Sequence, residues 1–359
     1  MRNPPIDEMD SPYSARCHRR PSGTQPGGPS SVGGLRMSEM AYHHRPVLLQ
    51  EVVDLFGPVP PGTVVDATVG GGGHARALLE AHDHLSVVGL DRDPRAVAVA
   101  AERLSDFPGR AWVRHYRSDR LATAMSDLNL SGASGVLLDL GVSSDQLDRA
   151  ERGFSHRLDG PVDMRMDPTN GQSAGELIEE ATEQQLAHLL RRYGDERYAG
   201  RIARAIVAAR PIASTARLAE VVRDAIPAPA RRRGRHPASR TFQALRIAVN
   251  AELEVLADSL DSAIDVLVPG GRCVVLSYHS GEDRIVKSRF RAAATGGCTC
   301  PPGLPCACGA VPTVALVRRG GITPSAAEVD ANPRAASARL RAVEKLPPPS
   351  VSDPERAEP

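Results

Sequence analysis

The sequence predicts an α/β fold in which an open parallel sheet is interrupted by an all-helical insert. Strand and helix patterns alternate from residue 41 to about 148, as expected for βαβ units. From about 149 to 238 helical patterns dominate and no convincing strand pattern appears. Strand patterns resume after Pro269-Gly270-Gly271, so we expect two separate parts of the chain to build the sheet.

The part before the insert contains four expected strands. The fourth is apolar up to Asp139, as a strand buried on both faces should be. A helix is expected directly after the glycines at 70–73, and the next helix starts with Asp93 as N-cap and Pro94 in its first turn. The expected strands are 64–69, 87–91, 111–116 and 135–141, and the first helix is 74–81.

The insert and the second part of the sheet follow in the same way. The insert is expected to hold helices at 173–182, 183–193, 195–209 and 215–225. One long helix is then expected at 241–267, and further strands at 272–278, 313–318 and 337–344. We therefore expect a disordered N-terminal extension at 1–40, a discontinuous sheet domain at 41–148 and 239–346, an inserted helical domain at 149–238 and a disordered tail at 347–359.

Composition sets broad limits on the class of protein. The chain has 359 residues, a formal net charge of +1 and 41% hydrophobic residues, enough for a sizeable core in one or two domains. No apolar run is long enough to span a bilayer, and no signal peptide is visible. We expect a cytoplasmic protein without a membrane partner. The sequence leaves monomer and homodimer open.

The run of four glycines from Gly70 to Gly73, between the first strand and its helix, indicates a cofactor site. No side chain shields the backbone there, so a ligand can lie against main-chain N–H groups. Asp91 ends the next strand about 20 residues later, where dinucleotide folds place the acid that holds ribose hydroxyls. The pattern predicts a nucleotide-like cofactor at the carboxyl edge of the sheet.

The type of cofactor follows from the residues around the glycines. The glycines are consecutive and follow Asp66, which argues against the G-x-G-x-x-G turn that binds a pyrophosphate. No Gly-Lys-Ser/Thr follows them, which argues against a phosphate-binding loop. An acid at the end of the first strand suits a cationic amino group. The predicted cofactor is therefore S-adenosylmethionine, with Thr68 at the first glycine position of the methyltransferase turn.

The end of the fourth strand supplies the candidate catalytic residues. Asp139 is expected to face the same crevice as Asp66 and Asp91, because ligands bind at the carboxyl ends of parallel strands. A turn or helix-capping acid is the alternative for Asp139. Neutral donors and acceptors for the edge of a base follow at Ser143, Ser144 and Gln146.

Two segments are candidates for nucleic-acid contact. In the first, Phe154 is expected to stack on a base and Arg152, Arg157 and Arg165 to reach phosphates. The alternative is a loop that packs onto the insert through Met164 and Met166. The second segment is a basic run that holds Arg231, Arg232, Arg233 and Arg235, for which a solvated loop is the alternative. His279 follows a strand end, and we favour a phosphate contact or a structural hydrogen bond over catalysis there.

Four of the six cysteines lie within eleven residues, at Cys298, Cys300, Cys306 and Cys308. Four thiols can hold a tetrahedral zinc ion, although the C-x-C spacing is tighter than the usual C-x₂-C. A reduced loop without metal is the alternative.

From His44 to Ala335 the chain resembles one family, the bacterial 16S rRNA (cytosine N4)-methyltransferases known as MraW. The shared motifs include LDLGVSS, ERGFS, GPVDMRMDP, RYGDERYA, RTFQALRI and HSGEDRIVK. The resemblance implies a Rossmann-like S-adenosylmethionine-dependent methyltransferase sheet with an inserted all-helical, substrate-binding domain. It implies a cofactor set of Gly72, Gly73, His74, Asp91, Asp139 and Gln146. Ser118 stands where the family has an aromatic residue, with Tyr116 as an alternative cover for the adenine, and Gly281 replaces the family's leucine.

The resemblance also implies a reaction and a partner. The reaction is methylation of the N4 amine of a decoding-centre cytidine of 16S rRNA, cytidine 1402 in common rRNA numbering, within the small ribosomal subunit. Asp139 is the first candidate for accepting a hydrogen bond and a proton from the amine, with Ser143 and Ser144 as alternatives. The alternatives for function are a methyltransferase acting on another RNA, a protein or a small molecule, and a non-catalytic ribosome assembly factor that retains the fold.

Overall fold

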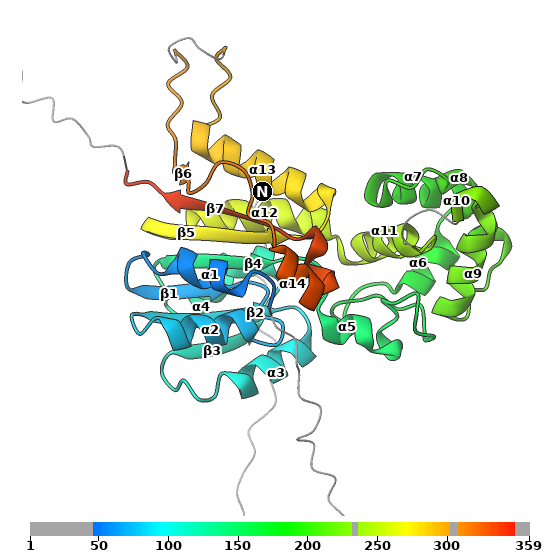
Figure 1. The fold of residues 1–359 in the computed structure, drawn as a ribbon, viewed down its shortest axis with the longest axis horizontal. Helices are drawn as coiled ribbons and strands as arrows, with labels where there is room; N and C mark the ends of the chain where they lie inside the picture. The colour runs from blue at the N-terminus through cyan, green and yellow to red at the C-terminus, as the bar shows by residue number, and fades with distance from the viewer. Residues whose placement is uncertain (1–45, 232–235, 302–306, 349–359) are drawn as a thin grey trace, which may run out of the picture. The chain divides into compact units, whose positions relative to one another are not determined.

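A computed structural model of the chain describes residues 46–231, 236–301 and 307–348, all within one compact unit. Seven strands form one sheet in the order β3-β2-β1-β4-β5-β7-β6 (Figure 1). The strands are β1 (Gly62–Asp66), β2 (Leu85–Asp91), β3 (Ala111–His115), β4 (Ala133–Asp139), β5 (Leu267–Ser277), β6 (Val314–Leu316) and β7 (Arg339–Lys345). The α/β fold predicted from the alternating pattern is thereby confirmed.

The sheet is parallel only in part. Strands β1 to β5 pair in parallel, whereas β7 runs antiparallel to both β5 and β6. The expectation of an all-parallel sheet is therefore wrong for the last two strands. The strand order reverses between β1 and β4, which are neighbours in space, and ligands of open α/β sheets bind beyond the carboxyl ends of such strands.

Helices cover both faces of the sheet. Buried apolar side chains of one face pack with α1 (Leu49–Phe56), α2 (Gly73–Ala81) and α3 (Pro94–Arg103). Those of the other face pack with α4 (Leu121–Asp127), α12 (Glu252–Asp265) and α13 (Ser280–Thr295). These three layers explain why the central strands are apolar along almost their whole length.

Between Asp139 and Asn250 the described residues contain helices and no strand. Their buried side chains form a hydrophobic cluster of their own, from Phe154 to Leu245, so this cluster extends beyond residue 238. The helices are α5 (Ser144–Asp148), α6 (Ala174–Glu180), α7 (Glu183–Gly194), α8 (Ala199–Ala208), α9 (Thr215–Ala225), α10 (Ala228–Arg231) and α11 (Ser239–Asn250), drawn in green at the right of Figure 1.

The single long helix expected at 241–267 is wrong. Helix α11 ends at Asn250, and Ala251 adopts a left-handed conformation with φ of 49° before α12 begins. The buried side chain of Asn250 accepts a hydrogen bond from the Met166 N–H at 2.8 Å and donates to the Met164 carbonyl at 2.7 Å. A contact with a segment some 85 residues away in sequence leaves no trace in helical periodicity.

Three further findings complete the fold. The C-terminal region also contains the short helix α14 (Ala326–Ala331), which precedes β7. Among the described residues, no helix is both long and apolar enough to span a membrane. The segment 1–40 and residues 349–359, both expected to be disordered, lie outside the described residues.

Candidate functional site

A cavity of about 560 Å³ lies at the carboxyl ends of β1, β2 and β4. Its walls include the glycine turn after β1, Asp91 at the end of β2 and Asp139 at the end of β4. The structure therefore brings together three features that the sequence placed at separate strand ends. The volume is within the usual range of small-molecule and cofactor pockets.

The glycine turn is shaped by backbone conformation and by close packing. Gly70 and Gly72 have positive φ angles of 51° and 75°, which other residues adopt only with strain. A Cβ atom on Gly73 would lie 2.5 Å from Pro46, whereas one on Gly72 would make an ordinary van der Waals contact with Ala100 of α3. Gly70 and Gly73 line the cavity, whereas Gly72 faces α3 and is not part of its wall.

Asp91 joins the glycine turn to the second strand. Its two carboxylate oxygens accept hydrogen bonds from the N–H groups of Gly70 and Asp93, each at 2.9 Å. Burial raises the pKa of Asp91 to about 6, although these two hydrogen bonds oppose the shift. Asp91 lines the cavity and is thus placed to accept hydrogen bonds from ribose hydroxyls.

The role predicted for Asp66 needs correction. Its side chain is 2% exposed, accepts a hydrogen bond from the Thr68 N–H at 3.3 Å, and is not part of the cavity wall. Burial, aided by the nearby charges of Asp139 and Asp91, raises its pKa to about 8. A carboxyl group that is mostly protonated at neutral pH and lies beneath the turn does not supply the negative charge that was expected to face the cofactor's amino group.

Asp139 contacts two side chains of the cavity wall. The Tyr278 hydroxyl donates a hydrogen bond to Oδ1 at 2.7 Å, and Nδ1 of His74 lies 3.6 Å from Oδ2. The backbone N–H of Asp139 donates to the Thr68 hydroxyl at 2.6 Å. Burial and the Asp139 carboxylate raise the pKa of Tyr278 well above 10, so the phenol remains a donor at neutral pH. The sequence analysis did not assign a role to Tyr278. Its position directly after β5 and before His279 could have indicated that it lies at the site.

His74 is buried, and its two ring nitrogens face different residues. Its Nε2 lies 3.0 Å from the Val47 carbonyl oxygen. Since a carbonyl oxygen only accepts, Nε2 is the nitrogen that carries a proton. His74 thus ties the start of α2 to the segment before α1, and its other nitrogen faces Asp139 in the cavity.

The residues after β4 form a capped helix rather than a set of freely available polar groups. Ser143 caps α5: its hydroxyl accepts from the Gln146 N–H at 3.2 Å, and Gln146 accepts from the Ser143 N–H at 3.1 Å. The Gln146 side-chain amide donates to Asp93 at 2.9 Å. Ser143, Ser144 and Gln146 all line the cavity, but Ser143 and Gln146 already have partners.

Ser118, which stands where the family has an aromatic residue, is a small residue of the cavity wall. Its hydroxyl lies 2.9 Å from the Ser259 hydroxyl of α12. Tyr116 donates its hydroxyl hydrogen bond to Asp127 and is not part of the cavity wall. The suggestion that Tyr116 covers the adenine is therefore wrong.

Phe154 and Arg152 do not present surfaces for RNA. Phe154 is 5% exposed and belongs to the hydrophobic cluster of the insert. Arg152 is 7% exposed, and its guanidinium donates to the Asp93 carboxylate at 2.7 Å and to the Met166 carbonyl at 2.9 Å. The predictions of base stacking and phosphate contact are wrong at these two positions. Met164 and Met166 are buried in the same cluster, as the alternative interpretation held.

The remaining basic candidates are placed differently. Arg165 forms a two-bond ion pair with Asp163, both bonds at 2.8 Å. Arg231 donates to the Ile226 carbonyl at 2.6 Å and lies 3.4 Å from Asp224. Arg233 lies outside the described residues, as do the neighbouring arginines of the basic run, Arg232 and Arg235.

His279 is a helix cap. Its Nδ1 accepts hydrogen bonds from the N–H groups of Gly281 and Glu282 at the start of α13. The other ring nitrogen lies 3.1 Å from the buried Glu282 carboxylate. This geometry agrees with the structural role that we favoured, although His279 also lines the cavity.

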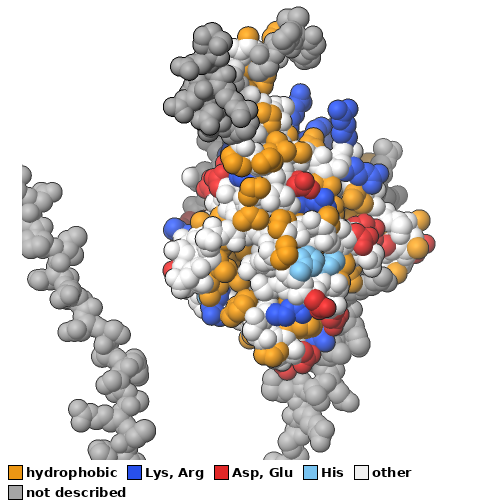
Figure 2. Space-filling view, turned by 90° about the vertical axis from the view of Figure 1, so that its left-hand side faces the viewer, with side chains coloured by type: hydrophobic (Ala, Val, Ile, Leu, Met, Phe, Trp, Pro, Cys, Tyr) orange, Lys and Arg blue, Asp and Glu red, His pale blue; other side chains and the backbone are white. Residues whose placement is uncertain are grey.

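A second cavity of about 1060 Å³ shares several wall residues with the first, including Gln243, Tyr278 and His279. Its wall carries more basic than acidic side chains: Arg192, Arg197, Arg240, Arg284 and Arg339 against Asp195, Glu196 and Asp283. By contrast, the face in Figure 2, on the side away from the insert, mixes positive, negative and hydrophobic side chains among its described residues, with no continuous basic area.

The residues present fit S-adenosylmethionine. Open glycine backbone, the Asp91 carboxylate and the polar start of α5 surround one cavity of suitable volume. In this fit, the turn accommodates a ligand close to the main chain and Asp91 receives the ribose hydroxyls.

Comparison with known proteins agrees with this site. The model of the MraW methylase family matches residues 41–346. The ribosomal RNA small subunit methyltransferase H of Heliobacterium modesticaldum is 49% identical over 313 residues, covering 86% of this chain and all of that protein. The protein of the same name from Acidothermus cellulolyticus is 52% identical over 313 residues, covering 85% of this chain and 94% of its own length.

Among solved structures, an rRNA methylase from Streptococcus thermophilus covers 83% of this chain and 95% of its own, with 11% identity and a TM-score of 0.38. The family match confirms the prediction of an S-adenosylmethionine-dependent methyltransferase. Both the extent of the family match and the identity to its relatives lead to one conclusion: the chain belongs to the MraW methylase family.

Proposed function

We propose that this protein methylates the N4 amine of the decoding-centre cytidine of 16S rRNA, with S-adenosylmethionine as the methyl donor. Relatives about half identical over their whole length are named ribosomal RNA small subunit methyltransferase H, which supports rRNA of the small subunit as the substrate class. The small ribosomal subunit is then the partner and the cytoplasm the place of action.

The observation that carries the proposal is the Asp139–Tyr278 pair at the boundary of the two cavities. Asp139 lines the first cavity together with the glycine turn, and Tyr278 lines both cavities. A nucleotide that enters along the basic second cavity therefore meets a carboxylate acceptor beside the cofactor site. A carboxylate suits an exocyclic amine, which donates hydrogen bonds.

Methyl transfer requires that these residues position the amine and favour a pyramidal nitrogen. Bound S-adenosylmethionine supplies a methyl group that is already activated by its sulfonium. The N4 lone pair of cytosine is delocalised into the ring, so the site must hold the amine in line with the methyl carbon. Asp139 accepts a hydrogen bond from the amine, which favours a pyramidal nitrogen, and Tyr278 fixes the orientation of the carboxylate.

The bonds and protons balance without a covalent enzyme intermediate. The N4 lone pair forms the new nitrogen–carbon bond, while the electrons of the sulfur–carbon bond go to sulfur. One amine proton is lost to Asp139 and from there to solvent. Cys273 is buried within β5, so it does not serve as a nucleophile toward the cytosine ring.

The test is tritiated methyl transfer from S-adenosylmethionine to 30S subunits, naked 16S rRNA and bulk protein in parallel. Nucleoside analysis of the labelled rRNA should yield N4-methylcytidine. Label in protein, or in a different nucleoside, would contradict the proposed substrate. Lack of transfer to any of the three, with S-adenosylmethionine binding intact, would favour a non-catalytic assembly factor.

A further inference from the structure

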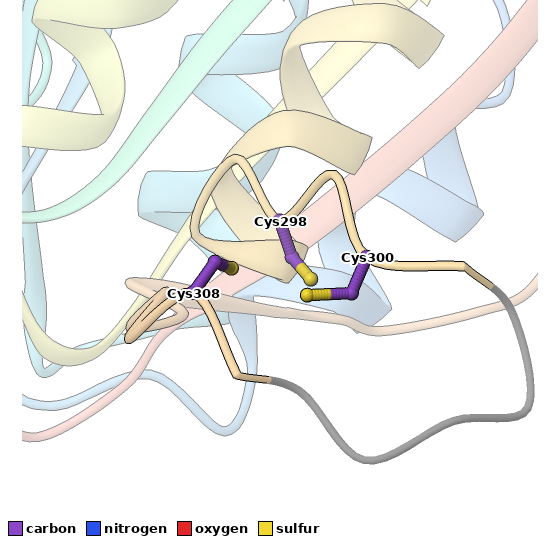
Figure 3. Close-up of side chains that lie close together, drawn as sticks. All are labelled: Cys298, Cys300 and Cys308. Carbon is purple, nitrogen blue, oxygen red and sulfur yellow. The ribbon is translucent and has the colours of Figure 1, made fainter.

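Three cysteines lie together in the long hairpin that connects α13 with β6. Cys298 and Cys300 are on the outgoing arm, and Cys308 is on the returning arm, beyond residues 302–306, which the structure does not describe. The three sulfur atoms all lie within 4.8 Å of one another. Figure 3 shows the side chains of both arms turned toward a common point.

The described parts of this hairpin have no regular secondary structure of their own. Residues 296–301 and 307–313 form neither helix nor strand. At the base, the Thr313 N–H donates to the Ala293 carbonyl at 3.0 Å, and Gly296 approaches the Val311 backbone so closely that a Cβ atom would lie 2.5 Å from it. Val311 itself is 53% exposed.

The backbone around the cysteines is shaped to bring the sulfurs together. Gly297 precedes Cys298 with φ of 73°, and Gly309 follows Cys308 with φ of 70°, conformations that glycine adopts without strain. The thiolate is the form of cysteine that binds metals, and three sulfurs this close to one another can share one ion.

We propose that Cys298, Cys300 and Cys308 bind one zinc ion, which clamps the two arms of the hairpin together. Thiolates are soft ligands that select zinc over magnesium or calcium. With zinc–sulfur distances of about 2.3 Å, tetrahedral thiolates lie about 3.8 Å apart, so the sulfurs need to move closer by at most roughly 1 Å. The fourth position of the tetrahedron is not assigned to a described residue.

The role of this zinc is structural and separate from methyl transfer. None of the three cysteines lines either of the two cavities of the functional site. A zinc ion that links residues on opposite arms holds these arms to one another. Cofactor binding should therefore survive its removal, so the zinc proposal stands or falls independently of the proposed function.

The experiment measures metal content and hairpin protection in the full chain. Wild-type protein, purified under reducing conditions without added metal, should contain about one zinc per chain by elemental analysis. The double variant Cys298→Ser/Cys308→Ser should contain less than a tenth of that. A matched control, Cys17→Ser, removes a cysteine outside the hairpin and should retain the metal.

Limited proteolysis with proteinase K supplies the second readout. Cleavage between residues 296 and 313 should be slow in the wild type and several-fold faster in the double variant or after chelation. Wild-type protein without zinc that also fails to take up one equivalent under reducing conditions would overturn the proposal. So would bound iron, a disulfide between two of these cysteines, or equal zinc content in the wild type and the double variant.

Discussion

Three aspartates end neighbouring parallel strands, and their surroundings separate their roles. Burial raises the pKa of Asp66 to about 8, whereas two backbone hydrogen bonds limit the rise at Asp91 to about 6. Asp139 is more exposed, with 24% of its side chain accessible, and has the Tyr278 hydroxyl as a partner. The same residue type at equivalent strand ends thus supplies a neutral group beneath the turn, a candidate acceptor for the ribose hydroxyls and a candidate acceptor for the amine.

The Asp139–Tyr278 pair leads to a prediction for catalysis. Asp139→Asn should lower kcat about 100- to 1000-fold, the usual cost of losing one preorganised electrostatic group. Tyr278→Phe retains the ring and removes the hydrogen bond, so it should lower kcat by a smaller factor, about 10-fold, through misorientation of the carboxylate. Single-turnover methyl transfer to the rRNA substrate, with S-adenosylmethionine affinity measured separately by calorimetry, checks both variants.

Ser144→Ala serves as the control for that pair, because Ser144 lines the same cavity and was the alternative candidate. It should retain most of the wild-type rate. A large loss in Ser144→Ala together with a normal rate in Asp139→Asn would transfer the acceptor role to the serine.

The raised pKa of Asp66 predicts a pH dependence of stability. In the unfolded chain this carboxyl ionises near pH 4, and in the folded protein only near pH 8. Between these values the folded state holds the extra proton, so this group makes stability fall as pH rises from about 4 to about 8. The variant Asp66→Asn should remove this loss of stability at higher pH.

Thermal unfolding at pH 5.5 and pH 8.5 checks this expectation. The difference in Tm between Asp66→Asn and the wild type should be more positive at pH 8.5 by at least a few degrees. Other groups titrate in both proteins, so only the difference between the two is informative. A pH-independent difference would mean that Asp66 is ionised in the folded protein throughout this range.

At the scale of elements, one buried carboxylate joins three segments. Asp93 caps α3 through the Arg95 N–H at 3.0 Å and also accepts from Gln146 of α5 and from Arg152 at the start of the insert. The Asp93-Pro94 pair in the sequence indicated the helix cap, but it did not indicate the contacts with Gln146 and Arg152. This junction fixes the start of the insert relative to the cofactor turn, since Asp93 also donates its N–H to Asp91.

Arg152→Ala should therefore lower the free energy of unfolding by about 3–5 kcal/mol, because it leaves the Asp93 carboxylate buried without a charged partner. Arg165→Ala is a matched control: it removes an ion pair only 13 residues away whose side chains are about a quarter exposed, and should cost about 0–1 kcal/mol. Denaturant unfolding of the three proteins gives the comparison. If both variants lost the same free energy of unfolding, the burial of the Arg152–Asp93 pair would not contribute to stability.

The sequence predicted the elements of the sheet better than the roles of individual side chains. The strand ends at Asp91 and Asp139 and the Asp93 cap follow from local rules about burial and capping, and the structure has all three. Phe154 and Arg152 were misjudged because burial depends on the packing of the insert, which composition does not reveal. The break at Ala251 and the contact of Tyr278 with Asp139 depend on residues that are distant in sequence.

At the scale of the whole molecule, the two cavities with a shared wall define the proposed path of the RNA. Exposed arginines of the second cavity come from the insert (Arg197), from α13 (Arg284) and from β7 (Arg339). The part of the basic run around Arg233, one of the two candidate segments for RNA contact, lies outside the described residues, and Arg231 contacts Asp224 and Ile226. We therefore expect the second cavity, rather than Arg231, to supply phosphate contacts.

Salt dependence tests this path. The logarithm of the binding constant for single-stranded RNA should fall with the logarithm of salt concentration by about 0.7 per phosphate contact. The triple variant Arg197→Gln/Arg284→Gln/Arg339→Gln should flatten this slope by about 2, while S-adenosylmethionine affinity stays unchanged. The control replaces three exposed arginines that line neither cavity, Arg204, Arg217 and Arg223, and keeps the net charge change the same. The slope of this control should match that of the wild type. If both triple variants reduced the slope equally, RNA binding would depend on the overall charge of the protein and not on the second cavity.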